Sequence, residues 1–169
     1  LVGSEMCIRD SYSEDGELIG LSGRATNDSP LRYMTMRFRD DLPLIFNLNN
    51  VDKTKTIYVT EGPIDSLFLP NSIAVAGSDF KKIDNDLKET AVLIYDNEPR
   101  NYEILKKLEE VIDLGYSVCI WNDKRLDGLK DINDMVENGL TVDEVIDIIN
   151  KCTFQGLSAK TKFMEYKKV

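Results

Sequence analysis

Histidine is absent from this 169-residue sequence, and cysteine and tryptophan are scarce, with three copies and one copy. Cys7, Cys119 and Cys152 are far apart and odd in number, so the sequence predicts neither a disulfide framework nor a zinc site. We therefore expect reduced, buried thiols and a cytoplasmic protein.

Positive charge is also in short supply, because 21 basic residues accompany 30 acidic ones and leave a net charge of −9. This surplus argues against unassisted, sequence-independent binding to nucleic-acid phosphates. Any such contact must come from a local basic patch or through bound cations. Apolar runs are short as well, and none approaches the roughly 18 residues that span a membrane, so we expect no membrane association.

The first eleven residues stand apart from the rest of the chain. The sequence begins with Leu1 rather than methionine, and residues 1–11 show no clear periodicity. They also resemble translated sequencing-adapter sequence. We therefore treat residues 1–11 as a non-native leader outside the fold, and the chain as an N-terminally truncated reading frame. The alternative is a native, disordered leader.

The remaining pattern predicts an α/β fold. Residues 18–26 and 31–38 form a hairpin-like pair around a turn cluster. Short apolar strands then alternate with amphipathic helices, which is typical of a mainly parallel sheet with helices on both faces. The predicted strands are residues 56–60, 72–76, 91–95 and 117–121, and the predicted helices are residues 64–69, 99–115, 131–137 and 141–151. A basic tail, residues 152–169, is expected to dock on the domain as an amphipathic helix, with DNA or a partner protein as alternatives.

Acidic residues interrupt this pattern where apolar strands end. Glu61 ends one strand, Asp96 and Glu98 end another, and Asp131 opens a helix soon after a third. Ligands of such sheets bind beyond the carboxyl ends of the strands, where these carboxylates should converge. Their mutual repulsion would need a divalent cation, and oxygen ligands select Mg²⁺ or Mn²⁺. Alternatively, Glu61 and Asp131 simply cap the helices that follow them.

These acids also carry a family resemblance. Glu61-Gly62, Asp96-x-Glu98 and Lys130-Asp131 resemble the Toprim pattern of DnaG-type primases, topoisomerases and several nucleases. The stretches TEGPIDSLFLPNSIAVAG and VLIYDNEPRN look particularly like primases of T-even-type phages. Upstream, GLSGR and PLRY resemble segments that precede Toprim in DnaG-type primases. The resemblance implies a Toprim domain over residues 53–151, preceded over residues 12–52 by a β-hairpin remnant of the primase N-terminal subdomain.

The resemblance also implies an activity, which is Mg²⁺-dependent synthesis of RNA primers by a DNA primase in an infected bacterial host. Glu61, Asp96 and Glu98 would be catalytic and, with Asp131, would hold Mg²⁺ or Mn²⁺. The groups expected to bind nucleotide or nucleic acid are Arg24, Arg32, Tyr33 and Arg37.

The expected partners are a single-stranded DNA template, ribonucleoside triphosphates and the replicative helicase. Two positions depart from the family pattern, because Glu98 and Asn133 stand where aspartate and an acidic residue are usual. A Toprim-type nuclease and a non-catalytic nucleotide-binding module are the alternative functions.

Overall fold

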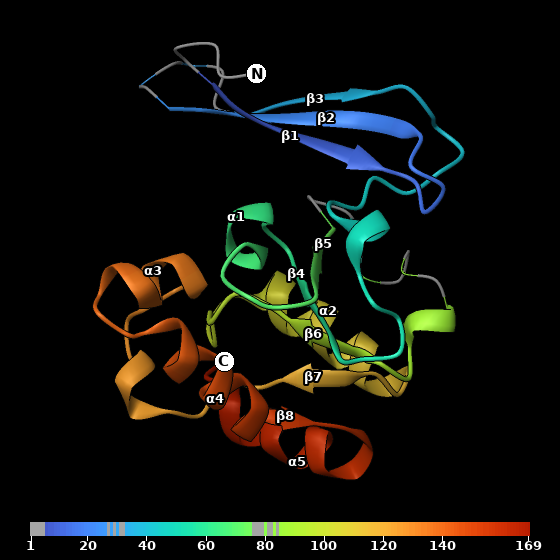
Figure 1. Ribbon diagram of the computed structural model, residues 1–169. Helices are drawn as coiled ribbons and strands as arrows, with labels where there is room; N and C mark the ends of the chain where they lie inside the picture. Colours follow the sequence, from blue (N-terminus) through green and yellow to red (C-terminus); the bar gives the residue numbers. More distant parts are fainter. Residues whose placement is uncertain are drawn as a thin grey trace.

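The computed structural model describes residues 6–26, 28, 30, 33–75, 80, 83 and 85–169. A three-stranded sheet lies across one side of a larger unit that contains a five-stranded sheet (Figure 1). In the described part of the chain, no helix is both long and apolar enough to cross a membrane.

The smaller sheet is antiparallel, with the order β1-β2-β3. Its strands are β1 (Met6–Tyr12), β2 (Leu18–Ala25) and β3 (Tyr33–Arg37). The predicted hairpin is thus confirmed as β2 and β3. Gly20 in β2 lets β3 pass close by, because an added Cβ would lie 2.7 Å from the backbone oxygen of Met36 in β3.

Strand β1 was not expected, since residues 1–11 were excluded from the fold. Residues 6–11 instead pair with β2 in register from Met6 opposite Ala25, and Ser11 is buried. Backbone pairing along an existing strand needs no hydrophobic period of its own, so the pattern of residues 6–11 carried no signal of a strand. Residues 1–5 lie outside the described residues, and the non-native origin of the leader stays a prediction.

The larger sheet has the order β5-β4-β6-β7-β8, and its first four strands are parallel. The side chains of β4 and β6 are buried throughout, as expected for strands covered on both faces. The chain leaves β4 for one neighbour, β5, and returns to the other, β6, so the strand order reverses between β4 and β6. The strands are β4 (Ile57–Thr60), β5 (Ser72–Ala74), β6 (Ala91–Ile94), β7 (Ser117–Cys119) and the antiparallel edge strand β8 (Thr153–Phe154).

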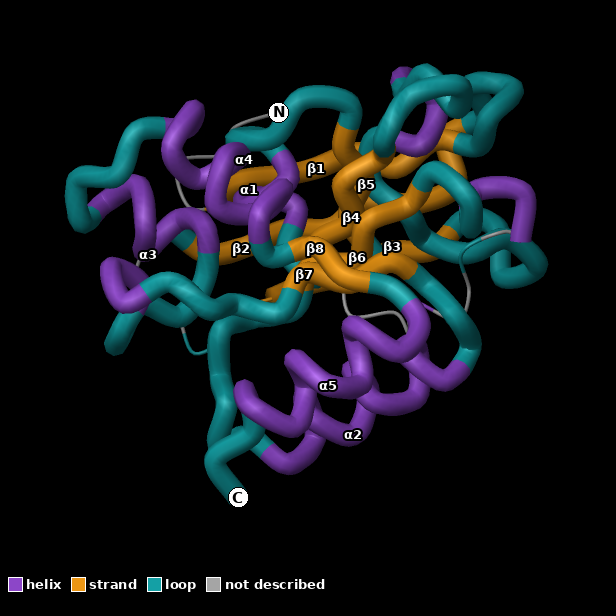
Figure 2. Tube along the Cα trace, turned by 90° about the horizontal axis from the view of Figure 1, so that it is seen from below, coloured by secondary structure: helices purple, strands orange, loops and turns teal. Residues whose placement is uncertain are grey.

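Helices cover both faces of this sheet, as predicted. Figure 2 shows α2 and α5 side by side on one face, with α1, α3 and α4 toward the other. The α-helices are α1 (Pro63–Ser66), α2 (Tyr102–Asp113), α3 (Ile132–Glu137), α4 (Val142–Lys151) and α5 (Gly156–Tyr166). The short 3₁₀ helices among the described residues are η1 (Leu48–Asn50), η3 (Asn85–Leu87) and η4 (Lys124–Leu126).

The basic tail packs on the domain. Strand β8 extends the sheet, and α5 buries Ala159, Phe163 and Tyr166 against the core. Two thiols, Cys119 and Cys152, are buried as expected, whereas Cys7 on β1 is exposed. The prediction of three buried thiols was therefore wrong for Cys7, because β1 belongs to the small outer sheet.

Candidate metal and nucleotide site

Three of the four predicted carboxylates meet at the point where the strand order reverses. Glu61 follows β4, Asp96 lies just beyond β6, and Asp131 is the N-cap of α3. All three line one small recess at the carboxyl ends of these strands. The sheet thus brings together side chains that are up to 70 residues apart in sequence, at the place where ligands of α/β sheets bind.

A fourth carboxylate, Asp65, lines the same recess and was missed from the sequence. It lies in the first turn of α1, and its Oδ1 accepts a hydrogen bond of 3.1 Å from the backbone N–H of Asn133 in α3. Gly62 leaves room for the carboxylate in this position, because a Cβ there would lie 2.5 Å from Asp65 Oδ2 and would displace it. No spacing rule related it to Glu61 in the sequence, because Glu61 precedes the N-cap Gly62 and lies outside the helix.

The electrostatics of the recess disfavour four ionised carboxylates without a counter-ion. The pKa of Asp65 is raised from 3.8 to about 6, chiefly by burial and in part by the charges of Asp131 and Asp96. Burial also raises the pKa of Asp96, to which the charge of Glu61 contributes. Desolvation and like charges both penalise the ionised forms, so a bound cation would stabilise this arrangement.

Two lysines partly neutralise these acids. Lys130 Nζ lies 3.3 Å from Asp96 Oδ2, and Lys107 Nζ lies 3.4 Å from Glu61 Oε1. The charge of Asp96 raises the pKa of Lys130, which therefore stays cationic at neutral pH.

Within the described residues, no three acidic or cysteine side chains are gathered closely enough to form a metal cage. The open arrangement of acids around the recess still fits Mg²⁺, which is usually held by one or two carboxylates together with waters and substrate phosphates.

Glu98, the remaining predicted ligand, faces a neighbouring hollow of about 800 Å³. Its Oε2 accepts a hydrogen bond of 3.1 Å from Asn101 Nδ2. Arg100, Lys124 and Lys168 also line this hollow. The ring of Trp121 borders both the hollow and the acidic recess, so Glu98 lies beside the other acids rather than among them.

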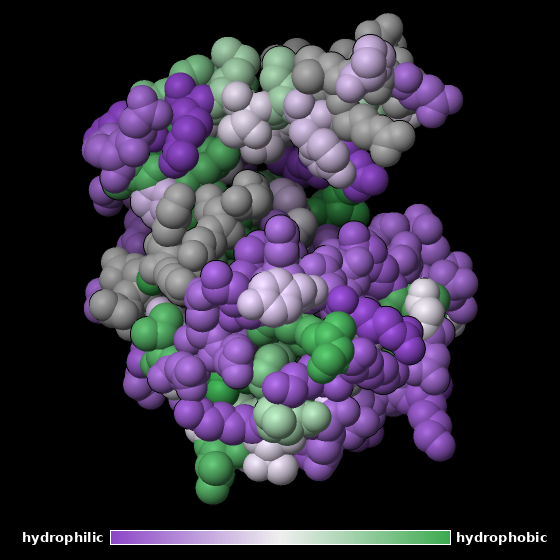
Figure 3. All heavy atoms as spheres, turned by 180° about the vertical axis from the view of Figure 1, so that it is seen from behind, coloured by the Kyte–Doolittle hydropathy of each residue, from purple (hydrophilic) through white to green (hydrophobic). Residues whose placement is uncertain are grey.

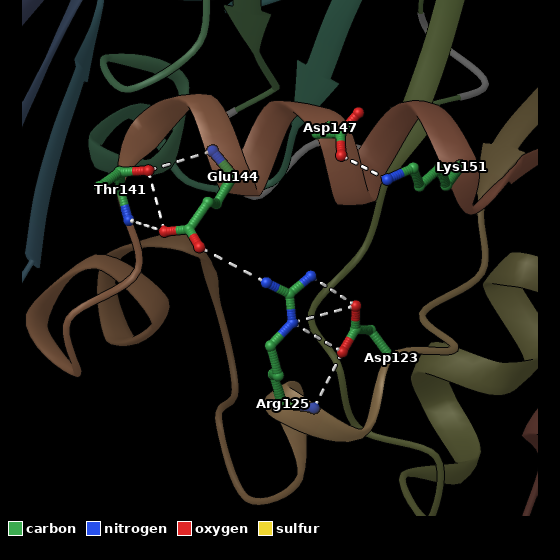
Figure 4. A network of polar contacts seen from close by, with 6 residues as sticks. All are labelled: Asp123, Arg125, Thr141, Glu144, Asp147 and Lys151. Carbon is green, nitrogen blue, oxygen red and sulfur yellow. Dashed lines mark hydrogen bonds and ion pairs between the residues drawn. The ribbon is translucent and has the colours of Figure 1, made fainter.

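The loop after β7 forms one wall of the hollow and is fixed to α4. Figure 4 shows the guanidinium group of Arg125 between Asp123 and Glu144, with N–O distances of 2.8 and 3.5 Å. Glu144 is also the third helical residue (N3) of the predicted capping box, in which Thr141 is the N-cap of α4. The predicted helix start is confirmed, and it anchors the loop that leads to Asp131.

The three-stranded sheet faces the acids across a cleft of about 520 Å³, and the molecule is visibly hollowed between the two parts when seen from behind (Figure 3). Arg24 and Tyr33 line this cleft, with the guanidinium carbon of Arg24 5.8 Å from the centre of the Tyr33 ring. Arg37 is not among the described lining residues, and instead donates a 2.7 Å hydrogen bond to the Leu42 carbonyl. Arg32 lies outside the described residues.

The alternative interpretation, in which Glu61 and Asp131 cap the helices that follow them, is wrong for Glu61 and right for Asp131. The N-cap of α1 is Gly62, without a side-chain hydrogen bond, so Glu61 does not cap that helix. Asp131 does cap α3, because its Oδ1 accepts a 2.8 Å hydrogen bond from the backbone N–H of Asp134. Asp131 therefore both begins a helix and lines the acidic recess.

The fold is that of DnaG-type primase catalytic cores. A DnaG primase catalytic domain bound to ssDNA matches with a TM-score of 0.69 and 16% identity, over 95% of this chain and 54% of that one. The primase fragment of the bacteriophage T7 primase-helicase matches with a TM-score of 0.63 and 20% identity, over 88% of this chain and 63% of that one. No protein-family model matches the chain.

The sequence is similar to a particular phage protein. The DNA primase of Enterobacteria phage T4 is 34% identical over 160 residues, which are 94% of this chain and 46% of that protein. The chain thus spans about half the length of this curated relative. The predicted resemblance to DnaG-type and T-even-type phage primases is confirmed.

Proposed function

We propose that this chain forms the Toprim part of a DNA primase, a nucleotidyltransferase that joins ribonucleotides into short RNA primers. The observation that carries the proposal is the convergence of Glu61, Asp65, Asp96 and Asp131 at one recess. Its support is the position of this recess, where the strand order reverses in a chain similar to a phage primase.

The carboxylates of Asp96, Glu61 and Asp131 would hold Mg²⁺ or Mn²⁺, one or two of them directly and the others through coordinated waters, with Glu98 as a ligand at the border of the neighbouring hollow. A cation bound there would offset negative charge on nucleotide phosphates and on leaving pyrophosphate.

The chain's own groups would bind and orient the reactants. Lys130, which now pairs with Asp96, is placed to exchange that carboxylate for a phosphate oxygen. Glu61 is either a further ligand or the group that accepts the proton of the attacking 3′-hydroxyl. Across the cleft, Arg24 and Tyr33 would contact nucleotide phosphate or template backbone.

The proposed partners follow from the same comparisons. One structural neighbour is bound to ssDNA, and another is the primase part of a primase-helicase protein. We accordingly propose single-stranded DNA, ribonucleoside triphosphates and a replicative helicase as partners. Because the protein carries a net charge of −9, template binding would depend on the cleft cations and on bound metal.

Primer synthesis by the complete protein tests the proposal. Asp96→Asn and Glu98→Gln keep side-chain size but remove a charged ligand, so each should abolish primer synthesis with the fold retained by circular dichroism. Asp143→Asn is a matched control, because Asp143 is exposed on α4. Normal priming by Asp96→Asn would contradict the proposal. Metal-dependent cleavage of DNA without synthesis would favour the nuclease alternative.

The 169-residue chain by itself should bind metal without making primers, since it spans less than half of the similar phage primase. Template-dependent polymerisation by the purified chain would refute this expectation.

A further inference from the structure

Asn97, which separates the two proposed ligands Asp96 and Glu98, uses its backbone N–H and both polar atoms of its side chain in hydrogen bonds to distant parts of the chain. Its backbone N–H donates to the Lys130 carbonyl at 2.6 Å. Its Nδ2 donates to the carbonyls of Leu126 and Leu129, at 3.1 and 2.9 Å. One side chain therefore joins the end of β6 to the loop that leads to Asp131.

The remaining polar atom of the Asn97 side chain, Oδ1, is held by the last helix. Tyr166, at the C-terminal end of α5, donates its phenolic hydroxyl to Asn97 Oδ1 at 3.3 Å. Tyr166 is only 8% exposed, and burial raises its pKa well above the usual value, so the hydroxyl stays protonated and able to donate. Just after α5, the backbone N–H of Lys168 donates to the Pro99 carbonyl at 2.9 Å.

Helix α5 is itself firmly placed, which makes it a suitable support. It buries Ala159 and Phe163 against the core and packs beside α2. The support is therefore rigid, whereas the segment that carries Asp96, Asn97 and Glu98 lies outside any helix or strand. Groups at a binding site gain affinity when neighbouring residues fix their orientation in advance.

From these contacts we propose that Tyr166 is a positioning residue, which sets the cation affinity of the Asp96–Glu98 segment through its hydrogen bond to Asn97. The inference rests on the proposed function, because it concerns the same carboxylates. Without the hydroxyl, Asn97 Oδ1 loses its partner while both amide donors keep theirs. The segment then samples more orientations, and a cation must order it on binding.

The test measures Mn²⁺ binding by the 169-residue chain at neutral pH, with calorimetry and the fluorescence of its single tryptophan. Trp121 borders both the recess and the hollow, so its emission should report occupancy. Tyr166→Phe removes only the hydroxyl and should weaken Mn²⁺ binding by about threefold to tenfold, the range expected from one neutral hydrogen bond. Tyr102→Phe is the matched control, because Tyr102 is 73% exposed at the start of α2.

Two further variants separate positioning from general loosening of the fold. Phe163→Leu disturbs the packing of α5 but keeps the hydroxyl that donates to Asn97, so it should lower the melting temperature more than Tyr166→Phe while leaving Mn²⁺ affinity nearly unchanged. In an Asn97→Ala background, Tyr166→Phe should have no additional effect on affinity, because the partner of the hydroxyl is already absent.

Equal Mn²⁺ affinity in wild type and Tyr166→Phe would overturn the inference and leave the proposed function standing. Equal losses in Tyr166→Phe and Phe163→Leu would overturn it as well, since α5 would then act only through stability. Failure of the wild-type chain to bind Mn²⁺ by either method would instead refute the metal site, and the inference with it.

Discussion

Replacing Asp65 by asparagine should stabilise the folded protein at neutral pH. The rise of the Asp65 pKa from 3.8 to about 6 means that ionising this carboxyl costs more in the folded state than in the unfolded state. A shift of that size corresponds to about 3 kcal/mol, which is an upper value for a half-buried group. Asparagine removes the charge and keeps an oxygen that accepts the hydrogen bond from the backbone N–H of Asn133.

The sign of the pH dependence follows from the direction of this shift. Between pH 3.8 and about 6 the folded state binds more protons at Asp65 than the unfolded state, so wild-type stability falls as pH rises. Urea unfolding of both proteins from pH 4 to pH 8 measures the effect. The two proteins should be nearly equal in stability at pH 4, and Asp65→Asn should be more stable by up to about 3 kcal/mol at pH 7.

Divalent metal should change the difference in stability between wild type and Asp65→Asn. Saturating Mg²⁺ should stabilise wild type more than the variant, because bound cation relieves the repulsion that Asp96 and Asp131 impose on Asp65. The reasoning would be refuted if Asp65→Asn were no more stable than wild type at pH 7 in metal-free buffer. An unchanged pH profile in the variant would refute it equally.

Three other perturbations probe the recess and the cleft. Mg²⁺ or Mn²⁺ should raise the melting temperature of the chain at neutral pH, and unchanged melting together with no calorimetric binding would contradict the metal site. Gly62→Ala should displace the Asp65 carboxylate, since the added Cβ would lie 2.5 Å from Asp65 Oδ2, and should therefore weaken Mn²⁺ binding. Calorimetry measures this effect, and wild-type Mn²⁺ affinity in the variant would contradict it. In the complete protein, Arg24→Ala should weaken nucleotide or template binding more than Arg37→Ala does, because Arg24 is among the described residues that line the cleft and Arg37 is not. A larger loss of binding in Arg37→Ala would contradict this prediction.

The sequence predicted the strands and helices whose buried residues form a continuous apolar run or recur at a regular spacing. Strand β6 is a continuous apolar run, and α2 repeats its buried residues at helical spacing, so both were found. Strands β1 and β8 were not found as strands, because they are held by backbone pairing with β2 and β7 rather than by a pattern of their own. Backbone partners at long separation leave no local signature.

The sequence likewise predicted part of the site and missed the rest. Acids that follow apolar strands pointed to Glu61 and Asp96, because strand ends meet at one edge of a parallel sheet. Asp65 was missed because an acid in the first turn of a helix has an ordinary explanation in the helix dipole. The pairing of Lys107 with Glu61 joins residues 46 positions apart, and Glu98 faces the neighbouring hollow. Both facts depend on tertiary packing.

The pairing of strands in the larger sheet sets the distance between two of the acids, independently of the number of residues that connect those strands. Strands β4 and β6 are direct neighbours, paired from Ile57 opposite Ala91 to Thr60 opposite Ile94, although 30 residues of sequence lie between their ends. The spacing between the acids that follow them is thus set by the ladder of backbone hydrogen bonds, roughly 4.8 Å from strand to strand. A change of length in the connection beyond β5 would leave Glu61 in place relative to Asp96, provided that the buried side chains of Phe80, Ile83 and Leu87 kept their places in the core.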